Sequence, residues 1–74
     1  MSTLSVHVVA IFRDGTRSTF DASLPAGPRY MPSLAASVKA ELGGRIPMRL
    51  ILITGFDVYD YTPSEVLEVL ELAA

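Results

Sequence analysis

The stretch "LSVHVVAIFRDGTRSTFDASL", residues 4–24, decides the fold, because two alternating segments flank one turn signal. Alternation with period two predicts a β-strand in each segment, and Asp14-Gly15 between them predicts a hairpin. The apolar side chains of the first strand share one face: Leu4, Val6, Val8, Ala10 and Phe12. The opposite face also carries Val9 and Ile11, so this strand is expected in the interior of the sheet.

The length of the hairpin loop sets which faces of the two strands meet. A two-residue turn would place Val8 beside Asp21 and point the two apolar faces in opposite directions. A loop of residues 13–15 places Val8 opposite Phe20 instead, and the apolar faces then coincide. Because a one-residue slip reverses a whole strand face, we predict the three-residue loop, a type I turn followed by a bulge with Gly15 in the left-handed conformation.

A helix follows the hairpin. Residues 25–32, "PAGPRYMP", hold three prolines and a glycine and are predicted to form a loop. Ser33 then caps a helix that runs to about Leu42, where Gly43-Gly44 stops it. Its apolar stripe is narrow and consists of Leu34, Ala35, Val38 and Leu42.

The rest of the chain repeats the order of two strands and a helix. Residues 48–54, "MRLILIT", are apolar on both faces and predict a second central strand. Thr54-Gly55 would turn the chain into a fourth strand within residues 56–61, with Arg49 opposite Asp60. "TPSE", residues 62–65, opens the last helix with a capping box.

These elements predict one α+β domain over residues 1–74. The element order is β-β-α-β-β-α, with three or four strands in an antiparallel sheet and two helices on one face. If strands one and three are central, the strand order is 2-1-3-4, with the first helix as a right-handed crossover.

Composition limits the settings in which this chain can work. It has no cysteine, which excludes disulfides and favours a cytoplasmic location. The longest apolar runs are the length of a strand and too short to cross a bilayer, so no membrane association is expected. No basic segment followed by a long apolar core opens the chain, so no signal peptide is expected.

Charge is distributed unevenly along the sequence. The net charge is −2, but residues 1–50 hold six bases and three acids, a balance of +3. Residues 51–74 hold five acids and no base, a balance of −5. This division is the strongest signal of function in the sequence.

Neither the side chains nor the glycines indicate an enzyme. His7 is the only histidine, and with no cysteine present we expect no metal site. The serines lie outside any nucleophile motif, and the glycines form no phosphate-binding loop, so no catalytic residue or cofactor is expected. Asp57 and Asp60 could hold Mg²⁺, but two acids in an edge strand more simply prevent edge-to-edge pairing.

The acidic end is the candidate binding surface. Tyrosines among its carboxylates are typical of protein interfaces. We expect a basic protein partner to contact Asp57, Tyr59, Asp60, Tyr61, Glu65, Glu68 and Glu71. The alternative is a solvated acidic face. The last helix also carries a wider apolar arc than one surface helix needs, which suggests a homodimer or a further partner.

A compact, acidic, cysteine-free domain ending in "FDVYDYTPSEVLEVLEL" resembles the small inhibitors of phages and mobile elements, above all anti-CRISPR proteins. The resemblance implies a non-enzymatic inhibitor in the bacterial cytoplasm that blocks a basic, nucleic-acid-binding surface of a CRISPR-Cas effector subunit, without binding nucleic acid itself. Two alternatives stay open. One is a nucleic-acid-binding or regulatory module that uses Arg13, Arg17, Arg45 and Arg49, and the other is a homo-oligomeric structural protein.

Overall fold

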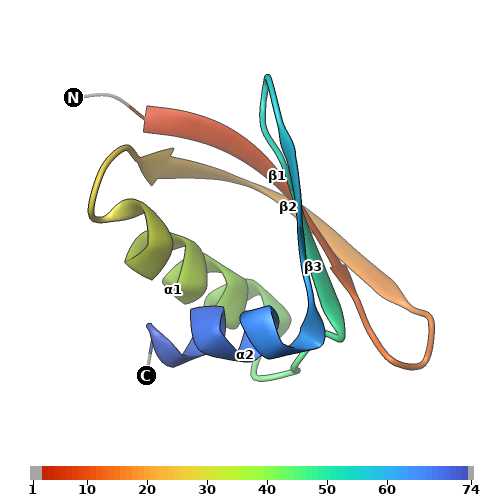
Figure 1. The fold of residues 1–74 in the computed structure, drawn as a ribbon. Coiled ribbons are helices and arrows are strands. Elements are labelled where there is room, and N and C mark those ends of the chain that lie inside the picture. Colours follow the sequence, from red (N-terminus) through yellow and green to blue (C-terminus); the bar gives the residue numbers. More distant parts are fainter. Residues whose placement is uncertain (1–2, 74) are drawn as a thin grey trace.

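The computed structural model describes residues 3–73 and shows four strands and two helices (Figure 1). Residues 1, 2 and 74, which the single-domain prediction also covers, lie outside the described residues. The elements are β1 (Thr3–Ile11), β2 (Arg17–Pro25), α1 (Tyr30–Leu42), β3 (Arg49–Ile53), β4 (Val58–Tyr61) and α2 (Pro63–Glu71).

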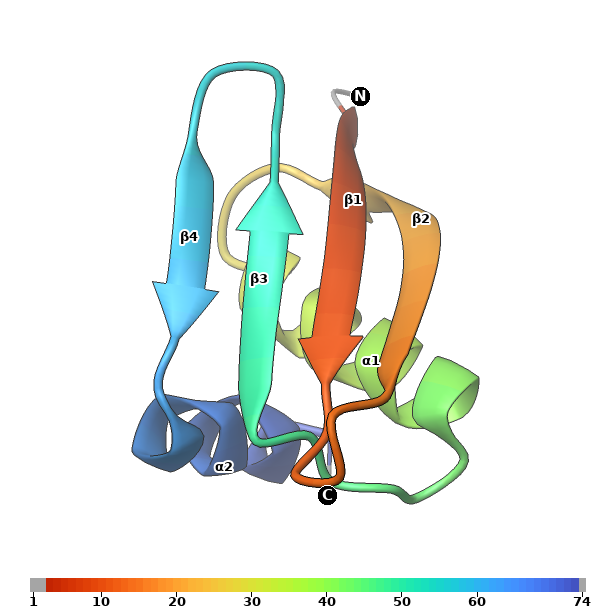
Figure 2. The same ribbon diagram turned by 90° about the vertical axis from the view of Figure 1, so that its right-hand side faces the viewer.

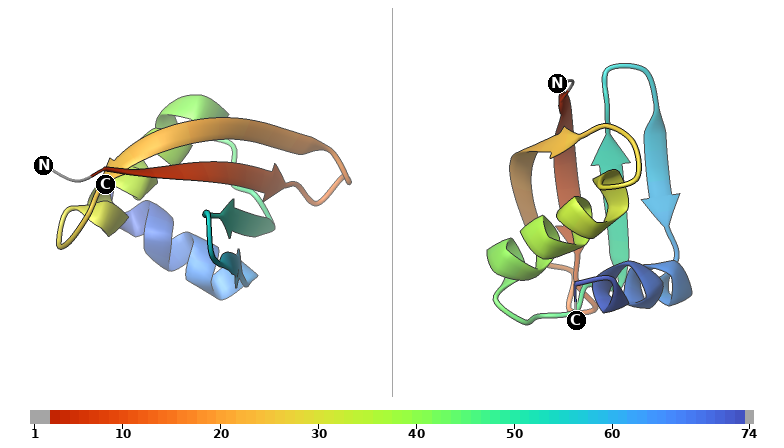
Figure 3. Two further views of the ribbon diagram at one scale, coloured as in Figure 1. Left: turned by 90° about the horizontal axis from the view of Figure 1, so that it is seen from above. Right: turned by 90° about the vertical axis from the view of Figure 1, so that its left-hand side faces the viewer.

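The sheet is antiparallel, with strand order β2-β1-β3-β4 (Figure 2). Both helices lie on one face of it, and the opposite face carries no element in the described part of the chain (Figures 1 and 3). The predicted fold class, strand order and helix placement are therefore confirmed. β1 and β3, the strands with apolar residues on both faces, are the central ones. This is expected, because a central strand has a neighbouring strand along each edge.

The β1–β2 hairpin has the predicted loop. Val8 lies opposite Phe20, and the backbone N–H of Phe12 donates to the Thr16 carbonyl at 2.9 Å. The N–H of Gly15 donates to the Phe12 carbonyl at 3.0 Å, which closes the turn. Gly15 has φ +89°, in the left-handed region that side chains disfavour. The loop length therefore sets the register, and the register sets which face of the hairpin is buried.

Replacing Gly15 with Ala should lower the free energy of unfolding by about 1 kcal/mol or more. No atom lies within 4 Å of the position that a Cβ would occupy, so the cost comes from the backbone conformation and not from a clash. Urea denaturation of the two proteins measures it. A neutral or stabilising substitution would contradict the bulge.

The core lies between the sheet and the helices. Its largest fully buried side chains come from β1, β2, β3 and both helices: Val6, Val8, Leu24, Leu34, Val38, Leu50, Leu52 and Val66. The predicted stripe of α1 is the buried one, residue for residue. In α2 the buried residues are Val66 and Val69, whereas Leu70 is only partly buried and Leu67 and Leu72 remain half exposed. The wide apolar arc of α2 is therefore only partly covered by its own chain.

Helix α1 begins at Tyr30, and its N-cap lies four residues before the predicted N-cap, Ser33. Arg29 is the N-cap residue, without a side-chain capping bond, and the N–H of Ser33 already donates to its carbonyl at 3.0 Å. The prediction was wrong because it treated Pro32 as a loop residue. A proline in the first helical turn sacrifices no intrahelical hydrogen bond, since N–H groups there have no partner within the helix.

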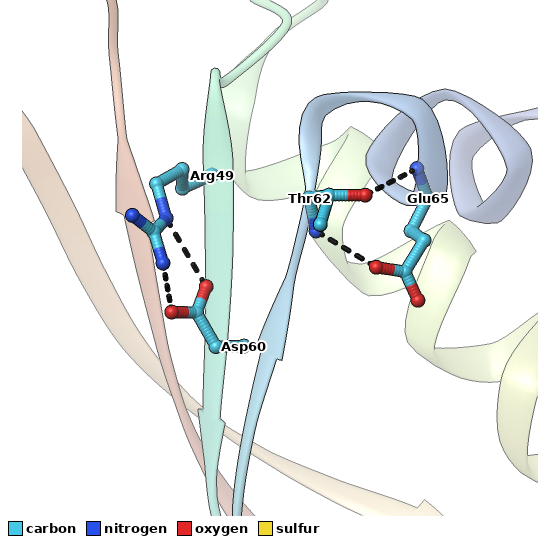
Figure 4. Close-up of polar contacts among 4 residues, drawn as sticks. All are labelled: Arg49, Asp60, Thr62 and Glu65. Carbon is cyan, nitrogen blue, oxygen red and sulfur yellow. Dashed lines mark hydrogen bonds and ion pairs between the residues drawn. The ribbon is translucent and has the colours of Figure 1, made fainter.

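The β3–β4 register also differs from the prediction. Ile53 lies opposite Val58 and Ile51 opposite Asp60, so the connection is residues 54–57 and not a two-residue turn. The Thr54 hydroxyl accepts from the Asp57 N–H at 3.0 Å and organises the loop. The shift is two residues, so each side chain keeps its predicted face. Arg49 therefore reaches Asp60 diagonally, through a bond from Nε at 3.2 Å and an ion pair from Nη2 (Figure 4).

The capping box of α2 is present as predicted (Figure 4). The N–H of Glu65 donates to the Thr62 hydroxyl at 3.4 Å, and the N–H of Thr62 donates to the Glu65 carboxylate at 3.1 Å. The hydrogen bond from the Thr62 backbone lowers the pKa of Glu65 below its ordinary 4.5.

Acid should therefore weaken the start of α2. A carboxylate with a lowered folded pKa contributes stability that is complete above its unfolded pKa and is lost as the pH falls through the folded pKa. Glu65→Gln can still accept the bond but does not titrate, so its melting temperature should fall less steeply below pH 4.5 than that of the parent protein. Thermal melts at a series of pH values measure this, and identical slopes would contradict it.

Candidate functional site

All three tyrosines of the chain line one open hollow of about 660 Å³. It lies where the tip of the β3–β4 hairpin and the start of β1 extend past the helices (Figure 3). We call it the tyrosine groove. Its lining residues are Thr3, Leu4, Ser5, Gly27, Tyr30, Thr54, Gly55, Phe56, Asp57, Tyr59 and Tyr61.

The sheet register places two of the tyrosines. Tyr61 pairs with Leu50 and Tyr59 with Leu52, and both leucines are fully buried, so the two rings project on the helix side of the edge strand. Tyr30, the first residue of α1, reaches the same hollow from the helix. The groove is therefore built by the sheet edge and the beginning of α1 together.

The hydroxyls of Tyr30 and Tyr61 are neutral donors at physiological pH, because their pKa values are raised. Burial is the main cause that raises the pKa of Tyr30 and the pKa of Tyr61 above 10.0. Neighbouring tyrosines raise both pKa values further. The Tyr59 hydroxyl donates to the Asp57 carboxylate at 3.4 Å, and that of Tyr61 lies 4.0 Å from the Met31 sulfur. The groove thus offers aromatic faces, protonated hydroxyls and one carboxylate.

A smaller hollow of about 270 Å³ adjoins the groove at Tyr61, which lines both. We call it the acidic hollow. It is lined by Met31, Tyr61, Glu65, Glu68, Val69 and Leu72. The two hollows therefore share Tyr61, and carboxylates line both, with Asp57 in the groove and two glutamates in the hollow.

The structure brings together five of the seven residues expected to bind a partner: Asp57, Tyr59, Tyr61, Glu65 and Glu68. It places Asp60 elsewhere, because the alternation along β4 sends its side chain to the other face, where it pairs with Arg49. Glu71 is exposed on α2 and lines neither hollow. Glu65 also completes the capping box at the start of α2.

Four residues of the two hollows are absent from the predicted binding surface: Leu4, Tyr30, Met31 and Phe56. Leu4 is 45% exposed and Phe56 is 98% exposed, so both offer apolar surface at the groove. The predicted loop of residues 25–32 includes Tyr30 and Met31, whereas the structure has both in the first turn of α1. One feature of the sequence could have indicated Tyr30 as a site residue: it is a third tyrosine, distant from the two in β4.

The charge division along the sequence is kept only in part in space, because Arg49 pairs with Asp60. Arg17 and Arg49 flank Ile11 in the sheet, and the Arg45 guanidinium lies 3.8 Å from the centre of the Phe12 ring beside the same hairpin. Arginines scattered in the sequence therefore gather near the β1–β2 turn, whereas the groove lies at the β3–β4 turn. These two turns lie at opposite ends of the sheet (Figure 2).

Within residues 3–73, no group of three histidine, cysteine, aspartate or glutamate side chains is placed to hold a metal ion. His7 Nδ1 lies 2.8 Å from Asp21, and both side chains are exposed to solvent. None of the described helices is both long and apolar enough to cross a membrane.

Comparison of the chain with protein-family models, with curated proteins and with solved structures found no match.

Proposed function

We propose that this protein is a small non-enzymatic binding protein that holds a basic segment of a partner protein in the tyrosine groove and the acidic hollow. One observation carries the proposal. All three tyrosines and Asp57 line one hollow, and a second hollow that shares Tyr61 with it is lined by two glutamates. Tyrosine and carboxylate together are the side chains that a basic segment binds best.

The chemistry favours arginine in that segment. A guanidinium stacks on the face of a tyrosine ring and donates in a planar fork to a carboxylate. Tyr30 and Tyr59 supply rings near Asp57, and Tyr61 supplies a ring near Glu68. Leu4 and Phe56 add apolar surface for the stem of the side chain or for a neighbouring residue.

A partner with a basic groove for nucleic acid presents such a segment. Lys and Arg gathered to hold phosphates attract carboxylates for the same electrostatic reason. We therefore propose that the protein acts as an inhibitor that occupies the nucleic-acid-binding surface of its partner, with a subunit of a CRISPR-Cas effector as the first class to test. Such a partner would place its action in the bacterial cytoplasm.

Intrinsic fluorescence offers a direct test, because the chain has three tyrosines, all in the groove, and no tryptophan. Titration with a short arginine-rich peptide should change the tyrosine emission with a saturating curve. A peptide of the same length rich in glutamate is the control and should leave the emission unchanged. Equal responses to both peptides, or none to either, would contradict the proposal.

A competition experiment tests inhibition separately from binding. Purified CRISPR-Cas effector complexes should lose DNA binding when the protein is added, and excess DNA added first should protect them. If the arginine-rich peptide binds while every effector tested stays active, basic-segment binding stands and this class of partner is wrong.

The gathering of arginines near the β1–β2 turn favours a second candidate, direct binding of nucleic acid. Arg49 is engaged with Asp60, and Arg45 lies over Phe12, so Arg13 and Arg17 would carry most of the contact. Binding of this kind weakens steeply with salt. A gel-shift experiment with Arg13→Glu/Arg17→Glu decides it: if the parent protein shifts DNA and this variant does not, the second candidate replaces the first.

A further inference from the structure

The backbone of β1 is paired along only part of the side that faces β3. β1 pairs with β2 along its whole length, but its pairing with β3 ends at His7, which lies opposite Ile53. Beyond Ile53 the chain bonds to itself, because the Thr54 N–H donates to the Asp57 carbonyl at 2.9 Å. Figure 1 shows the β3–β4 hairpin leaving the line of β1 at this end of the sheet. The start of β1 is therefore a free strand edge.

The alternation of hydrogen bonds shows which backbone groups this edge offers. The carbonyl of Ile11 accepts from the N–H of Met48, on the β3 side of β1, at 2.8 Å. Because antiparallel bonding alternates along a strand, the odd-numbered residues of β1 direct their N–H and C=O groups to this side. Thr3 and Ser5 therefore direct theirs to the free edge. Within the described part of the chain, the Ser5 N–H has no backbone partner.

The free edge borders the tyrosine groove. Thr3 and Ser5 line the groove, together with Leu4 between them. Leu4 shares a face of β1 with Val6, which is buried in the core beneath the helices. The side chain of Leu4 is therefore on the helix side of the sheet, where the tyrosines lie. Unpaired backbone groups and an aromatic hollow thus meet in one place.

We propose that the basic segment of the partner is extended and adds to the start of β1 as a short strand, in the line that β3 has left. This inference rests on the proposed function, because it concerns the segment held in the tyrosine groove. The segment exchanges backbone hydrogen bonds with Thr3 and Ser5, which is how a free strand edge holds a peptide. It runs antiparallel to β1, as both other neighbours of β1 do.

The pairing decides which side chain of the segment enters the groove. Residues directly opposite one another in a sheet project on the same face. The residue opposite Leu4 therefore projects on the helix side, into the hollow that the three tyrosines and Asp57 line. An arginine at this position can stack on a ring and donate to the Asp57 carboxylate. The two residues beside it, opposite Thr3 and Ser5, project on the open face of the sheet.

The two outer edges of the sheet do not offer this combination. β4 has only four residues, and a very short edge strand is one way in which proteins avoid further pairing. β2 has nine residues, but it carries Arg17, whose charge repels a basic segment. All three tyrosines line the groove beside β1 instead. A basic segment is therefore expected at β1 and not at an outer edge.

Amide hydrogen exchange, measured by NMR, tests the pairing in the parent protein. With a saturating concentration of the arginine-rich peptide, the amide of Ser5 should exchange slower by on the order of tenfold or more, because a bonded N–H is protected. Ser23 is the matched control, since it lies directly opposite Ser5 and its N–H faces the outer edge of β2. Its exchange rate should not change.

Replacing Ser5 with Pro removes the donor itself. A strand tolerates proline where the N–H faces solvent, so the fold should persist. The dissociation constant for the arginine-rich peptide, measured by tyrosine emission, should rise by on the order of tenfold. Ser23→Pro makes the same change at the outer edge of β2 and should bind as the parent protein does. Ser5→Ala keeps the N–H and should also bind normally, which separates the backbone from the hydroxyl.

Slower exchange at Ser5 alone, with binding weakened only by Ser5→Pro, supports the added strand. If Ser5→Pro does not fold, the exchange experiment decides by itself. A peptide that binds without slowing the Ser5 amide, or that binds both proline variants equally, leaves the proposed function intact and overturns the pairing. Slower exchange at Ser23 also overturns it, because the segment then lies on β2. If the parent protein does not bind the peptide, the pairing and the proposed function are both wrong.

Discussion

Replacing Leu34 with Ala should lower the free energy of unfolding by ~2–5 kcal/mol, the range for removing a buried leucine side chain from a packed core. Leu34 is fully buried on the sheet side of α1. Alanine is the best helix former, so the substitution removes packing without weakening the helix itself. A domain of this size has a total stability near the lower end of ~5–15 kcal/mol, so the variant should be close to unfolding at physiological temperature.

Urea denaturation at low temperature measures the effect while the variant is still folded. Leu67→Ala is the matched control, because it makes the same change on α2 at a residue that is 50% exposed. We expect it to cost less than half as much, since only part of its side chain leaves water on folding. Equal losses from the two substitutions would show that burial in this structure does not govern the stability of the chain.

Reversing Asp57 and Glu68 to Lys together should weaken binding of the arginine-rich peptide by on the order of 100-fold. One of these carboxylates lines the tyrosine groove and the other lines the acidic hollow, and Tyr61 lines both. Reversal removes two attractions and adds two repulsions at the place where the guanidinium groups would lie. Both side chains are exposed, so the melting temperature should hardly change.

The matched control is Glu41→Lys/Glu71→Lys, which changes the net charge by the same amount at two exposed residues outside the groove and the hollow. It should keep most of the affinity, and its small loss should disappear when salt shortens the screening length to ~8 Å or less. If the two double variants lose affinity equally, the overall charge decides binding and the groove does not.

Much of the fold follows from local features of the sequence. Of the two loop lengths considered around Asp14-Gly15, only the three-residue loop puts the apolar side chains of both strands on the same face. The structure shows that loop, with Val8 opposite Phe20. Thr62 and Glu65 predict the start of α2 because the capping bonds join residues three apart. Each of these features involves near neighbours along the chain, whose geometry the backbone restricts to a few forms.

The candidate site could be predicted only in part. The alternation of β4 is visible in the sequence, and it separates Asp60 from Tyr59 and Tyr61 as soon as the strand forms. The binding surface was nevertheless expected to include Asp60, because the prediction counted charges along the chain and did not assign them to faces. In the structure Asp60 pairs with Arg49 on the opposite face from the groove.

The sequence by itself determined the elements, the strand order and the identity of the buried stripe of α1, since these depend on periodicity and on short-range bonds. Only the tertiary structure decided where α1 begins and the β3–β4 register, and it alone brought Tyr30 beside Tyr59 and Tyr61. The physical reason is the separation along the chain of the residues that interact. A first-turn proline and a Thr-Gly loop are each compatible with several local geometries, and contacts with parts of the chain that are distant in the sequence select one. A groove lined by residues thirty positions apart exists only after those contacts have formed.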